Sequence, residues 1–472
     1  MALTILSIGL LVFAGHFLTG LFERTKVPDV LILMLAGMIL GPGLQIVTPA
    51  DFGKVGSVFT TLALVVILFE GGIHLNIKDL GRAASDTIFI SVATFALTVL
   101  LVTHTATLFL DVAPVTALLM GVILGGTSSA VVVPLIRILK PGDRAGTILL
   151  LESALTDVLA VVLALGLIGG LQADTGISAQ VLAKEVGLSF LVAAGIGAIG
   201  AFVWSAVLPK VRQLPNTVFT TIAYVLILFG ITELWGYSGA IASLAFGIGV
   251  ANLPNIPEAV QQKVISFRLV GFADVERTFF AETVFLVKTF FFVYLGISIS
   301  FSDIMTVWVG FVVAVVAVLG RSLIVRLLAP KTSSKRDALL MTALIPKGLA
   351  AAVLAAIPLQ LGIAGGDTIQ GIVYSTILFS IVISAALVFV IEGGRLDGMA
   401  KKLFRPFAAE ADSPHERTVS PFDQSLGLPA LPESFQEPNP VNLKPVLEGG
   451  EIPDLNLDSD KPEIPDLDLD RS

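Results

Sequence analysis

Two carboxylates lie inside a stretch of the sequence that is otherwise apolar enough to cross a lipid bilayer. Residues 149–167 read LLLESALTDVLAVVLALGL and contain Glu152 and Asp157. A charge at the centre of a membrane costs about 2.5–3.5 kcal/mol on insertion scales, so such residues usually face a cavity or a partner. The pattern therefore indicates a functional site, with a buried ion pair and helix-capping hydroxyls as the alternative.

The spacing of the two carboxylates predicts different surroundings for each. Five residues along an α-helix correspond to about 500°, which places Glu152 and Asp157 roughly 140° apart around the axis. One can be neutralised inside the protein while the other faces an opening. Ser153 and Thr156 add hydroxyl oxygens beside them. Small hard cations prefer oxygen ligands, so this stretch predicts half of a cation site around Asp157.

The composition is typical of a helical membrane protein. Of the 472 residues, 55% are hydrophobic and 14% are charged, whereas soluble domains carry about 25% charged residues. The absence of cysteine excludes disulfides and cysteine-based metal chemistry. The four histidines lack metal-ligand spacing, and no GxxxxGK[ST] motif supports ATP-driven transport. We expect no enzyme activity, no cofactor and no nucleic-acid partner.

Apolar runs of about 17–25 residues, long enough to cross a bilayer as helices, occur about thirteen times. They lie near residues 3–22, 28–47, 57–75, 87–109, 113–137, 145–169, 182–208, 217–234, 238–253, 282–301, 305–328, 338–360 and 369–392. The first run has no basic segment or clear cleavage site, so we interpret it as a retained span. The sequence predicts an all-α polytopic protein embedded in a lipid bilayer.

The basic residues between the spans predict the orientation of the chain. Alternate connections contain Arg24, Lys26, Lys78, Arg82, Arg137, Lys140, Arg144, Lys210, Arg212, Lys263, Arg268, Arg277, Lys331, Lys335 and Arg336. The other connections hold little beyond Lys54 and Lys184. Because basic loops remain in the cytoplasm, we expect the amino terminus outside and the carboxyl terminus inside, which requires an odd number of spans.

Two segments differ in character from the spans. Residues 406–472 are rich in Pro, Asp, Glu and Ser, so they cannot bury enough apolar surface to offset their chain entropy. We expect a transmembrane domain over 1–403 and an acidic, disordered cytoplasmic tail over 404–472, with a partner-docking peptide as the alternative. The connection Pro254–Phe280 is expected to form an amphipathic helix on the cytoplasmic face.

Two short internal similarities predict an inverted repeat. Gly72–Leu80, which closes the third span, resembles Gly296–Ile304, which closes the tenth, and Leu35–Gly41 resembles Ala245–Ala251. Both offsets are seven spans, and an odd offset reverses the chain direction across the membrane. Spans one to six and eight to thirteen would then form two six-helix inverted repeats joined by the seventh.

Such a repeat predicts paired spans that are interrupted near the membrane midplane. The fifth span contains Leu124–Ala130 (LGGTSSA), and the twelfth contains Leu344–Leu349 (LIPKGL). Helices unwind readily at Gly-Gly and Pro-Lys-Gly. We expect discontinuous helices that cross near the midplane, with carbonyls free to bind a cation and Lys347 offsetting the helix dipoles. Tight helix packing through small residues is the alternative.

Three further charged residues lie within spans. Glu70 is either a second acid at the cation site or a salt-bridging residue near the cytoplasmic mouth. Arg321 cannot lose its proton and needs a permanent anion, for which Glu152 is the expected partner. Lys288 either extends to the membrane surface or is buried and carries a proton.

Residues 1–400 resemble the bacterial sodium/proton antiporters of the monovalent cation:proton antiporter superfamily, nearest the NhaP-like branch. Glu152–Asp157 (ESALTD) is similar to the family's Glu-Ser-x-x-Asn-Asp signature, and Phe69–Gly72 (FEGG) to its Phe-Glu-Gly-Gly. Gly126–Ser129 (GTSS) stands where the family usually has Thr-Asp-Pro, and Pro346–Gly348 (PKG) stands near its Arg-Gly. The four motifs together make the resemblance specific.

The resemblance implies roles for residues within these motifs. Cation or proton binding is expected at Asp157, Ser153, Thr156, Ser128, the backbone of Thr127, and Glu70 nearby. A pair between Glu152 and Arg321 would hold the core helices together. Thr156 replaces the usual Asn, Ser128 replaces an Asp and Lys347 replaces an Arg. One carboxylate is therefore missing, which favours a weaker or larger-ion site.

We expect a secondary antiporter that exchanges a monovalent cation, Na⁺ before K⁺, for H⁺ by alternating access. The cation and the proton would compete for Asp157, because either one neutralises the carboxylate. One aspartate suggests one proton per cation, unless Lys288 also carries a proton. A K⁺/H⁺ antiporter is the nearest alternative, and a cation channel or a transporter-like sensor is a more distant one.

The same resemblance implies an architecture and a location. Core spans near 57–169 and 282–392 would move against scaffold spans near 3–47 and 182–253. We expect a homodimer formed through the scaffold, placed in the bacterial inner membrane and acting in pH homeostasis.

Overall fold

A computed structural model gives the fold of the chain. It describes residues 9–10, 12–17, 27–74, 85–172, 179–214, 217–253, 271–299, 303–396, 403–404 and 407. The chain divides into two units, Met1–His415 and Glu416–Ser472. The second unit lies outside the described residues, and so do most of the segment Pro254–Phe280 and most of the tail. The amphipathic helix and the disordered tail therefore stay predictions.

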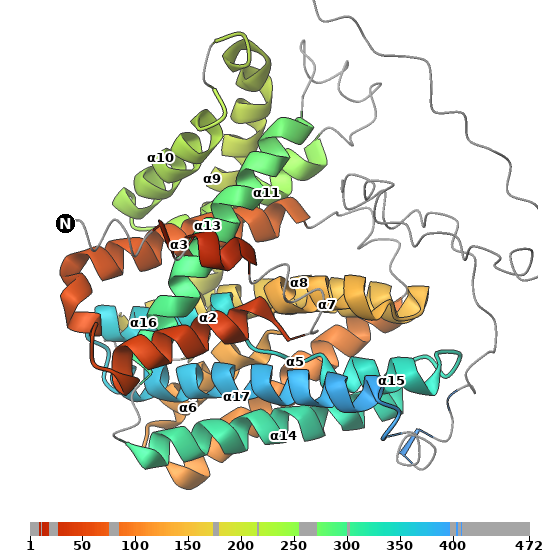
Figure 1. The fold of residues 1–472 in the computed structure, drawn as a ribbon. Coiled ribbons are helices and arrows are strands. Elements are labelled where there is room, and N and C mark those ends of the chain that lie inside the picture. Colours follow the sequence, from red (N-terminus) through yellow and green to blue (C-terminus); the bar gives the residue numbers. More distant parts are fainter. Residues whose placement is uncertain are drawn as a thin grey trace, which may run out of the picture. The chain divides into compact units, whose positions relative to one another are not determined.

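The described residues are helical or lie in turns and connections, and contain no strand (Figure 1). The helices are α2 (Asp29–Met38), η1 (Ile39–Gly43), η2 (Pro49–Phe52), α3 (Gly53–His74), α5 (Ser85–Phe109), α6 (Pro114–Gly125), α7 (Ser129–Leu139), α8 (Asp143–Gln172), α9 (Ala179–Val211), α10 (Thr220–Leu234), α11 (Gly239–Asn252), α13 (Asp274–Ser298), α14 (Ile304–Leu328), α15 (Lys335–Ala343), α16 (Leu349–Gln360) and α17 (Gly366–Glu392). The prediction of an all-helical chain is confirmed.

The helices coincide with the predicted spans from residue 28 onward. Within the described residues, seven segments are long and apolar enough to cross a membrane, and five shorter apolar helices accompany them. Residues 1–26 are described only in part, so the count of thirteen spans stays a prediction.

Both predicted interruptions occur at the expected places. The fifth span is divided into α6 and α7, which are separated by Gly126–Ser128, and the twelfth into α15 and α16, which are separated by Leu344–Gly348. Gly126 is extended (ψ 155°), and α15 begins with a capping box between Ser334 and Asp337. Each interruption leaves amide and carbonyl groups that need partners inside the protein.

The helices that surround these interruptions pack on one another. Helix α8 contacts α5, α6 and α7, while α17 contacts α14, α15 and α16. Figure 1 shows α14, in green, beside α17, in blue. Their apolar side chains join one buried cluster that extends over both interrupted spans.

Two close helix crossings depend on glycine. On α2 and α13, Gly37 and Gly296 face one another, and a Cβ on either would run into the opposite backbone. On α3 and α11, Gly72 and Gly247 face one another in the same way. Small residues of this kind let helix backbones approach closely in a membrane. Helix α3 thus packs most strongly on α11, and helix α13 on α2.

Candidate cation-binding site

The two interruptions touch each other through their backbones. The amide of Ser128 donates a hydrogen bond to the carbonyl oxygen of Pro346 at 2.8 Å. Gly348 lies directly against Ser128, where a Cβ would collide with the serine hydroxyl. The connection after α6 and the connection before α16 therefore form one crossing point. Backbone groups at such a crossing are the usual place for substrate and ion sites in discontinuous-helix transporters.

Helix α8 supplies side chains that cap the first interruption. Asp157 Oδ2 accepts hydrogen bonds from the Ser129 hydroxyl at 2.8 Å and from the Ser129 amide at 3.3 Å. Thr156 Oγ1 accepts from the amide of Thr127 at 3.1 Å and donates to the carbonyl of Glu152 at 2.8 Å. The carboxylate of Asp157 thus lies at the positive amino-terminal end of α7, where a negative charge is stabilised.

Exposure distinguishes Asp157 from its neighbours. Thr156 and Ser153 have no exposed surface, and Thr127 is 3% exposed, whereas Asp157 keeps part of its surface accessible. A carboxylate among buried hydroxyl groups inside a membrane needs a neutralising partner, and a proton and a cation are the candidates.

The oxygen atoms around Asp157 define what could bind there. Thr127 Oγ1 is buried and has no hydrogen-bond partner among the described residues. The Ser129 hydroxyl already contacts Asp157. No group of three or more His, Cys, Asp or Glu side chains that could hold a metal occurs within the described part of the chain. A single carboxylate with neutral oxygens suits a monovalent cation better than a tightly bound divalent one.

The structure adds a serine to those that the sequence suggested. Ser128 contributes its amide to Pro346, and Ser153 donates its hydroxyl to Leu150 within α8. Ser129, which the sequence analysis did not single out, holds the carboxylate. The sequence shows Ser129 in the GTSS segment, but its contact with Asp157 depends on helix α7 beginning at this residue.

Glu152 lies on another side of α8 and faces Arg321. Two guanidinium nitrogens contact the two carboxylate oxygens, with Nη2 at 2.6 Å from Oε2. Arg321 also donates to the carbonyl of Met341 at 2.8 Å and to the Thr94 hydroxyl at 3.0 Å. Glu152 is 1% exposed and Arg321 2%. The pair therefore links α8, α14, α15 and α5 away from solvent.

Glu70 and Lys288 belong to a second group of charges. Lys288 on α13 donates to Asp29 Oδ2 at 3.0 Å, and the charge of Lys288 also acts on Glu70 of α3. Asp29, the first residue of α2, was not singled out from the sequence. The ammonium of Lys288 therefore pairs with a buried carboxylate, and the Lys288 side chain is 14% exposed.

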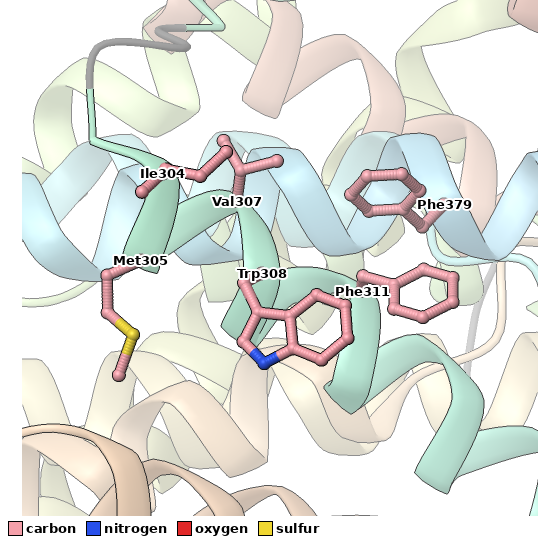
Figure 2. Close-up of a pocket in the computed structure, with 6 residues that line it drawn as sticks. All are labelled: Ile304, Met305, Val307, Trp308, Phe311 and Phe379. Carbon is pink, nitrogen blue, oxygen red and sulfur yellow. The ribbon is translucent and has the colours of Figure 1, made fainter.

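An apolar groove lies apart from these charges, at the start of α14. It has a volume of about 480 Å³ and is lined by Ile304, Met305, Val307, Trp308, Phe311 and Phe379 (Figure 2). None of these side chains carries a charge, and none contributes a hydrogen bond to Asp157. The groove is therefore not the cation site.

Comparison with known proteins places the chain in a family. The family model described as "Sodium/hydrogen exchanger, transmembrane" matches residues 9–391. The chain belongs to the sodium/hydrogen exchanger family. It is accordingly a multi-pass membrane protein, and the resemblance in the sequence motifs is confirmed.

Curated relatives match the chain at low identity. The K(+)/H(+) antiporter NhaP2 of Shewanella sp. (strain MR-4) is 24% identical over 388 residues, which cover 80% of this chain and 64% of the relative. The Na(+)/H(+) antiporter 1 of Methanocaldococcus jannaschii is 27% identical over 168 residues, which cover 34% of this chain and 39% of the relative. The chain thus spans less than two thirds of the length of these relatives.

A solved antiporter structure shares the fold. The sodium proton antiporter MjNhaP1 from Methanocaldococcus jannaschii, at pH 8, matches with a TM-score of 0.63 at 22% identity. The match covers 82% of this chain and 99% of that chain. The prediction of a polytopic antiporter fold with discontinuous helices is confirmed.

Proposed function

We propose that this exchanger-family chain is a secondary antiporter that exchanges a monovalent cation for protons at Asp157. The observation that carries the proposal is the position of Asp157, whose carboxylate is held by Ser129 at the crossing of two interrupted helices. The relatives are named both K(+)/H(+) and Na(+)/H(+) antiporters. Na⁺ is the first candidate substrate and K⁺ the second.

The mechanism follows from charge. An ionised carboxylate is costly to carry through an apolar barrier, whereas a protonated or cation-bound carboxylate is not. Asp157 holds one or the other, so each passage in one direction carries a cation and each return carries a proton. Among the described residues, Asp157 is the carboxylate that contacts the crossing. One proton per cation and electroneutral exchange are therefore proposed, with a second proton carried by Lys288 as the alternative.

The proposed ligands are the Asp157 carboxylate and the nearby threonine and serine oxygens. Thr127 Oγ1 is buried without a described partner, and Ser129 Oγ lies 2.8 Å from the carboxylate. Of the remaining residues assigned by family resemblance, Thr156 accepts a hydrogen bond from the Thr127 amide and Ser128 donates its amide hydrogen to Pro346. Ser153 and Glu70 are proposed from the resemblance alone. Glu152 and Arg321 hold the helices that present it.

Alternating access requires two bodies that move against each other. The proposed bodies are the core spans near 57–169 and 282–392 and the scaffold spans near 3–47 and 182–253, and each body draws one segment from each half of the proposed inverted repeat. In this division α3 and α13 belong to the core but pack most strongly on α11 and α2 of the scaffold, so motion between the bodies passes through these two crossings. The glycine pairs support the repeat: Gly37 and Gly247 occupy equivalent places in the two internal similarities, as do Gly72 and Gly296. Under the repeat, the α2–α13 crossing therefore corresponds to the α3–α11 crossing.

The proposed setting is the bacterial inner membrane, with a homodimer formed through the scaffold, the amino terminus outside and the tail inside. Purified protein in vesicles tests the function. The proton flux driven by an outward gradient of Na⁺, K⁺ or Li⁺ should be measured for each cation, with and without a clamped voltage. Cation flux without proton counterflow would identify a channel instead.

A further inference from the structure

Lys347 is a buried cation at the crossing of the two interrupted helices. It lies in the connection between α15 and α16 and is 1% exposed. Its Nζ donates a hydrogen bond to the carbonyl oxygen of Gly126 at 2.9 Å. Gly126 directly follows α6, so the ammonium binds at the carboxyl-terminal end of that helix. This end carries the negative part of the helix dipole and attracts cations.

No carboxylate forms a salt bridge with Lys347 among the described residues, although the charges of Asp157 and Glu152 act on it. A buried ammonium has three donors to satisfy, and its one described acceptor is a carbonyl oxygen. The family position at this point usually holds an arginine, whose planar group cannot act as a compact point charge. A lysine ammonium resembles an alkali ion more closely in size and charge distribution.

Gly126 belongs to the surroundings of Asp157. A Cβ on Gly126 would lie 3.3 Å from Asp157 Oδ1, the carboxylate oxygen that does not contact Ser129. A cation bound to that oxygen is therefore next to the Gly126 main chain. Unwound carbonyls at such helix ends coordinate Na⁺ in other discontinuous-helix transporters. The carbonyl of Gly126 belongs to this unwound segment, and the Lys347 ammonium already binds it.

We propose that Lys347 is a tethered cation that withholds the Gly126 carbonyl from the transported ion and thereby determines how tightly the site binds it. The inference rests on the proposed function of Asp157. The ion then binds with the carboxylate, the Thr127 and Ser129 hydroxyls and water, but without this carbonyl. Weak binding favours release, which an exchanger needs on both sides of the membrane.

Three substitutions separate the charge of Lys347 from its hydrogen bond. Lys347→Gln removes the charge and keeps a donor for the carbonyl, Lys347→Met removes both, and Lys347→Arg keeps both. The apparent cation affinity is measured as the Na⁺ and K⁺ dependence of proton flux in vesicles at one fixed pH. A second measurement, independent of transport, is the rise in melting temperature that each cation produces in the detergent-solubilised full chain.

We expect Lys347→Met to bind cations more tightly than Lys347→Gln by about threefold to tenfold, the equivalent of one hydrogen bond to a carbonyl. Both neutral variants should bind more tightly than the wild type, and Lys347→Arg should bind no more tightly. The melting temperature of Lys347→Met should respond to lower Na⁺ concentrations than that of Lys347→Gln.

Equal affinities for Lys347→Met and Lys347→Gln would overturn the inference, because charge alone would then explain the effect. If Lys347→Met does not fold, Lys347→Ala replaces it, and failure of both would assign the residue a purely structural role and reject the inference. Failure of the proposed function has a different result: the wild type would exchange no cation, or Asp157→Asn would still exchange one.

Discussion

Arg321 and Glu152 form a two-pronged ion pair that solvent does not reach, with the arginine also bound to a backbone carbonyl and a threonine. Removing one partner leaves an uncompensated buried charge, which costs about 3–5 kcal/mol. The pair joins α5 and α8, which lie before and after the first interruption, to α14 and α15, which precede the second. Its removal is therefore expected to weaken the assembly that presents Asp157, rather than the chemistry at Asp157.

Glu152→Gln tests the role of this pair. It should lower the melting temperature of the purified protein strongly, while the protein that remains folded retains a similar apparent cation affinity. The measurements are thermal unfolding in detergent and cation-dependent proton flux at a temperature well below the transition. The double variant Glu152→Gln with Arg321→Met should recover part of the stability, because no charge is left unpaired. An unchanged melting temperature for Glu152→Gln would contradict the role.

Asp157→Asn tests the site itself. The amide cannot bind a proton or neutralise a cation, so exchange should fall to the background of empty vesicles. Because asparagine can still accept the hydrogen bonds of Ser129, folding should be preserved, and the melting temperature in the absence of cations should change little. Acidifying the wild type should raise the apparent KM for the cation, since protons compete for the same carboxylate. Cation-dependent proton flux that persists in Asp157→Asn would refute the assignment.

The sequence predicted the parts of the molecule that depend on hydrophobic length and on residue type. The long apolar runs specified the helices, and glycine or proline specified the two interruptions. The expected partner of Arg321 followed because a permanent charge inside a membrane needs an opposite one. Each of these conclusions follows from local composition or, for Arg321, from the need of a buried charge for an opposite one.

The details that the sequence did not predict depend on three-dimensional placement. Ser128 and Ser129 are adjacent and chemically identical, and which of them contacts Asp157 depends on where α7 begins. Asp29 lies 259 positions from Lys288 in the chain, and nothing in its local sequence indicates that they pair. The carbonyl beside Lys347 likewise has no sequence signal, because every residue carries one.

Ser129→Ala tests the ligand that the structure adds. Loss of a hydrogen bond to a charged group is worth about 1.5–3 kcal/mol, so the proton should compete better and the apparent KM for Na⁺ should rise by about tenfold or more. The matched control is Ser128→Ala, whose hydroxyl does not contact Asp157 among the described interactions. Proton flux in vesicles measures both. A larger effect of Ser128→Ala would favour Ser128, as the family resemblance implies, over Ser129.

The paired glycine crossings give a prediction about the inverted repeat. Gly72→Ala and Gly296→Ala would each place a Cβ against the opposite helix backbone, and overpacking of this kind costs about 1–3 kcal/mol. The matched control is Gly71→Ala, because a Cβ there has no heavy atom within 4 Å and alanine favours the helix by up to about 1 kcal/mol.

Thermal unfolding of the three variants measures the effect. If the two crossings are equivalent under the repeat, Gly72→Ala and Gly296→Ala should lower the melting temperature by similar amounts, while Gly71→Ala should leave it unchanged or raise it. A loss at only one crossing would mean that the two are not energetically equivalent. Equal stability of Gly72→Ala and Gly71→Ala would contradict the close approach of α3 and α11.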